Sequence, residues 1–188
     1  SMPRRPNIII TIADDHRHSA IGALEMEAVR TPVLDGLCRR GTVMTRAFTM
    51  GSTVPAVCAP SRAMLHLGRT LWHCPQPWRE DRAGEVDGDA NPTLGSQLRA
   101  AGYHTHGIGK WHNRRDSYAK SFDSGAAIYF HGMSSHVEVP VHDFDPAGIY
   151  PREAERIEHT CSSDLFADAA VKTLDTYDGA KPCFLHCA

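Results

Sequence analysis

Short apolar runs and amphipathic segments alternate along the chain, and their order predicts its secondary structure. The run at residues 7–12, NIIITI, is continuous and β-branched, which is typical of a strand buried on both faces of a sheet. Further elements follow in alternation. The pattern predicts strands over 43–49, 103–109 and 181–187, and helices over 32–41, 61–67, 91–102 and 162–177.

Local signals mark the ends of two of these helices. Asn91 is expected to cap the helix at 91–102, with Pro92 in its first turn and Gly102 as its stop. The last helix should be capped by Ser162 or Ser163. One face of that helix is expected to be apolar and to contain Phe166, Ala170, Leu174 and Tyr177.

The alternation predicts an α/β fold in which helices sandwich a mainly parallel sheet. With 188 residues, of which 41% are hydrophobic, the chain is long enough for one domain with a real core. Segments 72–90 and 113–158 show weak periodicity and are expected to be loop excursions at the surface. Because ligands of parallel sheets bind at the carboxyl ends of the strands, polar residues just past each strand are the first candidates for a site.

Such residues follow two of the predicted strands. Asp14 and Asp15 come after the first strand, where adjacent carboxylates either cap a turn or bind a hard cation such as calcium or magnesium. Lys110 and His112 come after the strand at 103–109, and Trp111 between them is expected to turn into the core. Because both pairs directly follow predicted strands, together they indicate a site at the carboxyl ends of the strands more strongly than either pair does alone.

Cys58 opens the stretch CAPSR at a predicted junction between a loop and a helix. A buried structural cysteine would account for it. A peptidase-like Cys-His pair is a second reading, although no flanking signature supports it. A tyrosine-phosphatase-like loop needs five residues between its cysteine and its arginine, whereas Arg62 lies only four positions after Cys58. The spacing therefore excludes the phosphatase loop.

CAPSR matches C-x-P-S-R, the signature of the type I, formylglycine-dependent sulfatases of the alkaline-phosphatase-like superfamily. The resemblance extends over most of the chain and follows the order of the amino-terminal half of that family. Five segments carry it: RPNIIITIADDHR, TPVLDGLCRRGTVMTRAF, VCAPSRAMLHLGR, TLGSQLRAAGYHTHGIGKWH and SSDLFADAAVKTLDTYDGAKPCFLHCA.

The resemblance implies that Cys58 is converted to formylglycine by a formylglycine-generating enzyme, for which Pro60 and Ser61 chiefly serve as recognition residues. In the family the hydrated aldehyde attacks the sulfur of a sulfate monoester, and its second hydroxyl then expels sulfate. By the same match, Asp14, Asp15 and the residue at position 58 would bind one calcium ion, which polarises the sulfate.

The resemblance also implies roles for three cationic or proton-transferring residues. Arg62 and Lys110 would stabilise the hydrate and lower the pKa of its hydroxyl, and His112 would assist attack or regeneration of the aldehyde. Further calcium ligands, and a histidine and a lysine on the sulfate, lie downstream in the family and cannot be assigned before Ala188. We therefore expect an apparently truncated catalytic domain over 1–188, with an incomplete calcium site.

Two other functions stay open beside the sulfatase. The chain can be a catalytically silent fragment or pseudo-sulfatase that binds anions or a partner, or it can act on phosphonates or phosphate diesters, as relatives of this fold do. For the sulfatase, we expect a sulfated small molecule as the substrate, and a sulfated saccharide is favoured. Residues in unmatched loops favour the saccharide: Trp72, His73, Trp78, Tyr129, Phe130, His131 and His136.

The charge of the chain and the length of its apolar runs exclude nucleic acid and a membrane span. A formal net charge of −2 and the absence of a basic run argue against nucleic acid as a partner, and no apolar run is long enough to cross a membrane.

The start of the chain, SMPRRPNIII, lacks a secretory signal and favours a cytoplasmic location, unless a signal was removed. The six scattered cysteines are expected to be free thiols. In CFLHC, Cys183 and Cys187 should share one face of a strand and His186 the other, so a zinc site there is improbable.

Overall fold

The computed structural model describes residues 5–48, 57–74 and 91–188. The chain divides into two compact units, and each is described by itself. One unit consists of Ser1–Ile12 with Gly51–Ala188, and the other of Ala13–Met50.

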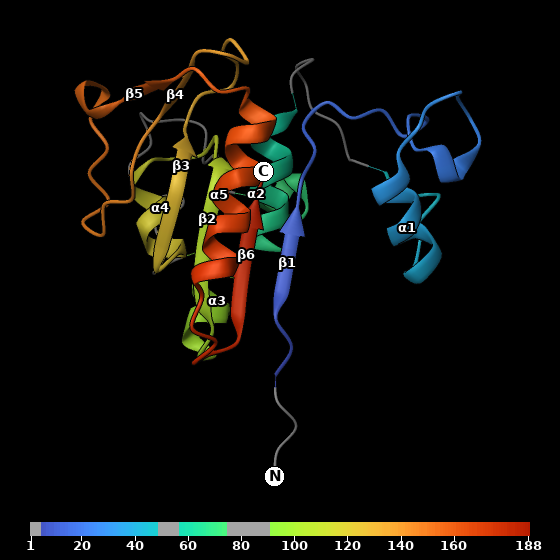
Figure 1. Cartoon of the computed structure of the whole chain (residues 1–188). Coiled ribbons are helices and arrows are strands. Elements are labelled where there is room, and N and C mark those ends of the chain that lie inside the picture. Colours follow the sequence, from blue (N-terminus) through green and yellow to red (C-terminus); the bar gives the residue numbers. More distant parts are fainter. Residues whose placement is uncertain (1–4, 49–56, 75–90) are drawn as a thin grey trace. The chain divides into compact units, whose positions relative to one another are not determined.

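A four-stranded parallel sheet forms the centre of the larger unit (Figure 1). Its strand order is β1-β6-β2-β3, so the closing strand of the chain lies between the first two strands in sequence. This arrangement confirms the predicted α/β fold with a parallel sheet. The strands are β1 (Ile8–Thr11), β2 (His104–Lys110), β3 (Ser124–Tyr129) and β6 (Cys183–Cys187), and a separate antiparallel pair is formed by β4 (Val139–Val141) and β5 (Arg156–Glu158).

Helices cover both faces of this sheet. On one face α5 (Ser162–Thr176) packs through Phe166, Ala169 and Ala170 onto Ile108, Cys183 and Leu185, which belong to β2 and β6. The opposite face is covered by α2 (Cys58–Leu67), α3 (Leu94–Ala100) and α4 (Asp116–Ser121). The smaller unit contains α1 (Pro32–Arg40), and three short 3-10 helices complete the described chain: η1 (Gly22–Leu24), η2 (Leu71–His73) and η3 (Arg152–Ala154).

Aromatic rings fill the layer between the sheet and its α2–α4 face. Phe122 is fully buried, and its ring lies near those of Trp111, Tyr118 and Phe184, at centroid distances between 4.9 and 6.4 Å. Aromatic side chains bury large apolar areas, so this cluster supplies a major part of the folding free energy.

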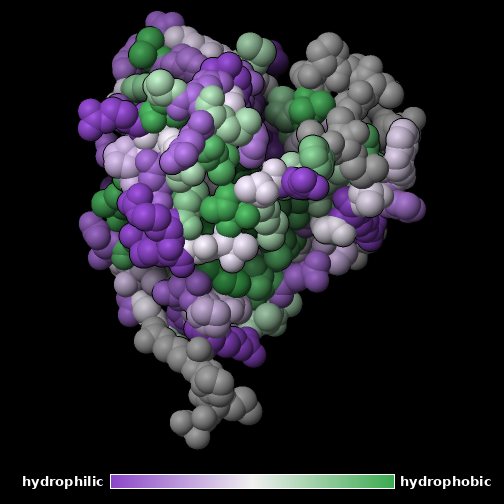
Figure 2. Space-filling model, turned by 90° about the vertical axis from the view of Figure 1, so that its right-hand side faces the viewer, coloured by the Kyte–Doolittle hydropathy of each residue, from purple (hydrophilic) through white to green (hydrophobic). Residues whose placement is uncertain are grey.

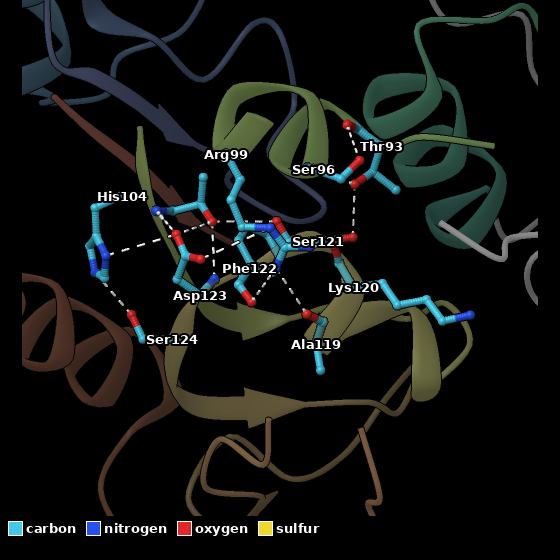
Figure 3. Close-up of polar contacts among 11 residues, drawn as sticks. Thr93, Ser96, Arg99, His104, Ala119, Lys120, Ser121, Phe122, Asp123 and Ser124 are labelled. Atoms are coloured by element: carbon cyan, nitrogen blue, oxygen red, sulfur yellow. Dashed lines mark hydrogen bonds and ion pairs between the residues drawn. The ribbon is translucent and has the colours of Figure 1, made fainter. Parts of the chain in front are cut away.

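A polar network ties α3, α4 and the amino-terminal end of β2 together (Figure 3). Arg99 on α3 donates to the carbonyl of Lys120, 2.6 Å away, and to those of Ala119 and Phe122, and so satisfies the open carbonyls at the end of α4. The carboxylate of Asp123 accepts from the Thr105 N–H at 2.9 Å. The network therefore sets the start of β2, at the opposite end of the strand from Lys110.

Strand β1 lies at one edge of the sheet. Ile9 on β1 is 53% exposed. Figure 2 shows hydrophobic residues gathered on the face of the molecule that it views. None of the helices among residues 5–48, 57–74 and 91–188 is long and apolar enough to span a bilayer.

The expectation of a loop excursion over 113–158 was wrong. Its later part contains β4 and β5, with Val139 and Val141 buried in the core, and its first part is also regular. Helix α4 and strand β3 lie there, β3 pairs with β2, and Tyr118 on α4 is 1% exposed. The glycines that suggested a loop serve a close approach instead: a Cβ on Gly125 would lie 2.5 Å from the Tyr118 hydroxyl, and one on Gly107 would overlap it. Of the segment 72–90, residues 75–90 lie outside the described part.

Other local expectations also need correction. Residues 43–48 form no strand in the described chain, where Met44 and Phe48 are 77% and 88% exposed and lack a partner strand. Thr93, and not Asn91, caps α3, because its hydroxyl accepts from the Ser96 N–H at 3.2 Å.

The last helix departs from its expected cap and apolar face at two points. No side chain caps α5, which follows Cys161, so neither expected serine does so. Leu174 is 44% exposed and lies off the buried face, although Phe166, Ala170 and Tyr177 do pack against the core.

Replacing Phe122 with alanine tests the central role of the aromatic layer. The truncation leaves a cavity among rings that cannot collapse, so Phe122→Ala should lower the free energy of unfolding by about 3–5 kcal/mol. Urea unfolding followed by circular dichroism measures the change. Phe48→Ala is the matched control, because Phe48 is 88% exposed and its loss should cost less than about 0.5 kcal/mol.

Candidate functional site

Helix α2 begins at Cys58, so the CAPSR stretch forms its first turn and a half. Cys58 is half-buried with a free thiol at the amino terminus of the helix, where unpaired backbone N–H groups favour negative charge. Arg62 lies one turn further on, is 4% exposed, and donates from Nη1 to the carbonyl of Lys110 over 2.5 Å. This hydrogen bond joins the CAPSR helix to the end of β2.

The end of β2 is redirected by a bulge. The register with β3 shifts between Ile108 and Gly109, and the extra residue on β3, Ala127, has a left-handed φ of 46°. Gly109 has a φ of 79°, and a Cβ there would overlap the carbonyl oxygen of Ala188. Beyond the bulge, backbone bonds from Lys110 to Ala188 (2.7 Å) and from Trp111 to Tyr129 (2.8 Å) fix the segment on both sides.

The side chains of the GKWH segment separate as the sequence predicts. Trp111 is 1% exposed, and its indole N–H reaches the Arg114 carbonyl at 3.0 Å, so it belongs to the core. Lys110 is 8% exposed, and its Nζ donates to the carbonyl of Gly132 at 2.7 Å. His112 has a φ of 48°, a conformation that costs a non-glycine residue energy and is concentrated at functional sites.

Asp14 and Asp15 follow β1 closely but belong to the smaller unit. Both are exposed, and Asp15 has a left-handed φ of 57°. Within the larger unit, the structure joins Arg62, on the helix that begins at Cys58, to the end of β2, which leads into His112. The two carboxylates belong to the other unit.

The carboxylates are oxygen donors of the kind calcium prefers, but too few to complete a site. In the described part of the chain, no group of three or more His, Cys, Asp or Glu side chains could hold a metal ion. These residues therefore do not by themselves fit a complete calcium site.

A buried histidine pair behind Arg62 was not anticipated as part of the site. His66 lies one turn after Arg62 on α2 and is 3% exposed, and its ring lies 4.6 Å from that of Trp111 and 4.7 Å from that of His186 on β6. Within the described residues, neither ring nitrogen of His66 has a hydrogen-bond partner. A histidine four positions after Arg62, on the helix face that carries it, was the available signal.

Burial decides the charge of this pair. Burial, helped by the nearby Arg62 guanidinium, lowers the pKa of His66 to about 3. Burial also holds the pKa of His186 well below its usual value, with the neighbouring His66 and Arg62 acting in the same direction. Both rings are therefore neutral at physiological pH. The expectation that His186 faces away from Cys183 and Cys187 is confirmed, since the cysteines pack towards α5.

Two loop aromatics expected at a saccharide-binding rim are core residues instead. Tyr129 is 5% exposed and packs with Val139 and Val141 of β4, and Phe130 is 7% exposed and belongs to the aromatic layer. Trp72 is 76% exposed and stays available at the surface, and Trp78 lies outside the described residues.

The family model and the individual relatives that match this chain indicate the same protein family. The Sulfatase family model matches residues 6–188. The chain is 28% identical over 184 residues to an N-acetylglucosamine-6-O-sulfatase of Bacteroides thetaiotaomicron, which covers 97% of this chain and 30% of the relative. It is 29% identical over 202 residues to an arylsulfatase of Klebsiella aerogenes, with 95% of this chain and 40% of the relative covered.

Solved structures show the same fold. A structure of a protein in complex with its substrate, D-glucosamine-2-N,6-O-disulfate, superimposes with a TM-score of 0.75 at 23% identity, over 98% of this chain and 34% of that chain. The crystal structure of Ps i-CgsB gives a TM-score of 0.74 at 23% identity, over 98% of this chain and 45% of that one.

The chain therefore belongs to the sulfatase family. It spans 30% to 40% of the length of the two sulfatases described above.

The buried histidine pair predicts a pH-dependent stability. Unfolded His66 has an ordinary pKa of 6.5 and folded His66 one of about 3, so the unfolded chain binds the extra proton between these values. The contribution of neutral His66 is complete above the unfolded pKa and declines as the pH falls towards the folded one. Lowering the pH from about 7 to about 5 should therefore cost about 2 kcal/mol through His66 alone.

Urea unfolding at several pH values measures this slope. His66→Leu should reduce it by the His66 contribution, because leucine takes up no proton. His18→Leu, at an exposed histidine, should leave it unchanged. An equal slope in wild type and His66→Leu would contradict the assignment.

Proposed function

We propose that this chain carries the nucleophile-bearing part of a sulfatase active site and takes part in hydrolysis of a sulfate monoester. The observation that carries the proposal is the 2.5 Å hydrogen bond from Arg62 to the Lys110 carbonyl. It joins CAPSR to GKWH through two residues that lie 48 positions apart, and the sequence resemblance implies catalytic roles for both motifs.

Cys58 is the proposed site of formylglycine, formed by a formylglycine-generating enzyme that acts on the unfolded chain. When present, the hydrated aldehyde supplies a nucleophilic hydroxyl for attack on sulfur and a second hydroxyl whose deprotonation releases sulfate. Its place at the amino terminus of α2 supports the proposal, because helix N–H groups there stabilise developing negative charge.

The remaining residues would hold charge and move protons. Arg62 and Lys110 are buried cations, and each is oriented by a backbone carbonyl, so they are preorganised to stabilise an anion beside position 58. His112 has a strained backbone at the strand end and would serve as the proton donor or acceptor for the leaving alcohol or the hydrate.

For calcium, we propose that Asp14, Asp15 and residue 58 contribute ligands, with the others supplied from beyond the residues described. A bound calcium ion would supply Lewis-acid polarisation of the sulfate. For the substrate, we propose a sulfated saccharide. The sulfated sugar acted on by the Bacteroides relative and the exposed Trp72 support this choice.

Modification at Cys58 is the first test. In a host that makes the formylglycine-generating enzyme, mass spectrometry should find the aldehyde in the peptide that contains residue 58. Cys58→Ala should abolish both the aldehyde and hydrolysis of an aryl sulfate, because no nucleophile remains. Cys161→Ala removes an exposed free thiol and should change neither.

The same assay separates the competing functions. Modification with no turnover of aryl sulfate or sulfated saccharides would indicate a silent fragment. Turnover of an aryl phosphate diester in preference to the sulfate would indicate a phosphodiesterase. An unmodified thiol in a host that modifies other sulfatases would contradict the role of Cys58.

Calcium binding by the 188-residue chain is expected to be weak. Two adjacent carboxylates provide few of the six to eight oxygens that calcium takes, and they repel each other. Calorimetric titration of calcium into the chain should show little heat, with Asp14→Asn and Asp15→Asn as comparisons. Tight binding of one ion, lost in both variants, would show that residues of this chain complete the site.

A further inference from the structure

The loop after β3 touches both of the candidate residues at the end of β2. Lys110 Nζ donates to the carbonyl of Gly132 at 2.7 Å. A Cβ built on Gly132 would lie 2.8 Å from Cε1 of His112, closer than real Cβ contacts allow, and 3.0 Å from Nε2, which is also tight. A single backbone position therefore holds the lysine ammonium and adjoins the imidazole.

Glycine is required at 132 by the space available and not by its backbone. The φ of Gly132 lies outside the left-handed range that disfavours other residues, in contrast to Gly109 and Gly148. An alanine would be tolerated by the backbone, and its methyl group would collide with the ring of His112. The obstacle to a side chain is therefore His112 itself.

The backbone next to Gly132 is anchored. His131 Nε2 lies 2.7 Å from the carboxylate of Glu155, which also accepts from Arg115 Nη2 at 3.1 Å. The Arg115 guanidinium in turn stacks over the Phe130 ring, 5.2 Å from its centroid. Because the loop is held from this side, a new methyl group at 132 should displace the imidazole more readily than the loop.

We propose that Gly132 is a positioning residue for the reaction, acting through Lys110 and His112. Its carbonyl oxygen sets the lysine ammonium in place, and its missing side chain leaves the room in which the imidazole lies. The effect on turnover rests on the proposed function, in which Lys110 and His112 act on the sulfate ester. The placement of His112 does not rest on the proposed function, and it can be measured without a substrate.

Gly132→Ala tests the proposal with a single added methyl group. Since misplacement of a catalytic group by about 1 Å can cost about 10²-fold, kcat on an aryl sulfate should fall by about that factor, and its pH profile should change shape. KM should change much less, because His112 is proposed to transfer protons and not to hold the ester. Gly36→Ala is the matched control, because a Cβ there meets only ordinary contacts, 3.5 Å or longer, and it should behave as wild type.

A second readout shows whether the effect passes through His112. In the chain carrying His112→Ala the space is open, so adding Gly132→Ala should cause no further loss of kcat. The loss of stability from Gly132→Ala should also disappear in that background, which is non-additivity of the kind found for residues in contact. Additive losses would indicate a merely structural role for Gly132 and would overturn the proposal.

NMR of the His112 imidazole keeps this test separate from the proposed function. Gly132→Ala should shift the His112 ring resonances, and Gly36→Ala should not. If wild-type protein hydrolyses no sulfate ester while the resonances shift and the stability cycle is non-additive, the positioning role stands and the proposed function fails. Unshifted His112 resonances in Gly132→Ala would overturn the inference whatever the turnover.

Discussion

The hydrogen bond between Arg62 and the carbonyl of Lys110 is the contact on which the candidate site depends. A buried guanidinium needs strong acceptors, and a carbonyl at a strand end is held rigidly by the sheet. Because Cys58 lies one turn before Arg62 on the same helix, the bond also sets where the first residue of α2 lies relative to β2. The helix cannot shift along the sheet without leaving a buried charge without this acceptor.

The carboxyl end of β2 provides that acceptor through unusual backbone geometry. The bulge between Ile108 and Gly109 and the left-handed residues at 109, 112 and 127 turn the chain out of the regular strand. Backbone bonds to Ala188 and Tyr129 stabilise the turned segment from both neighbouring strands. Conformations of this kind cost energy and persist when surrounding contacts outweigh it. Here, those contacts also place Lys110 and His112.

Behind the site, His66 and His186 bury polar rings whose nitrogens are incompletely hydrogen-bonded within the described residues. The stable form of this arrangement is neutral, since a charged imidazole would be desolvated next to Arg62. The pair fills the space between α2, Trp111 and β6 with rings that carry no net charge. It therefore supports the position of Arg62 without competing for the anion that Arg62 is proposed to bind.

The sequence alone determined the alternation of strands and helices at both ends of the chain, the parallel sheet, and the family. Runs such as NIIITI and the amphipathic pattern of α5 are local signals, and they report local structure directly. CAPSR and GKWH are likewise contiguous, so the segments that carry the candidate site could be named without coordinates. The same local signals failed at 43–48, where an apolar pattern has no partner strand in the described chain.

Only the tertiary structure decided what the glycines and histidines do. Gly107 and Gly125 resemble loop residues in the sequence, but they make room for Tyr118, and Gly132 makes room for His112. A glycine specifies close approach only in relation to the group that approaches it, and that group lies elsewhere in the chain. Among the histidines, His66 is buried and His18 is exposed, although the residue type is the same. Burial depends on packing between elements distant in sequence, and a local pattern does not contain that information.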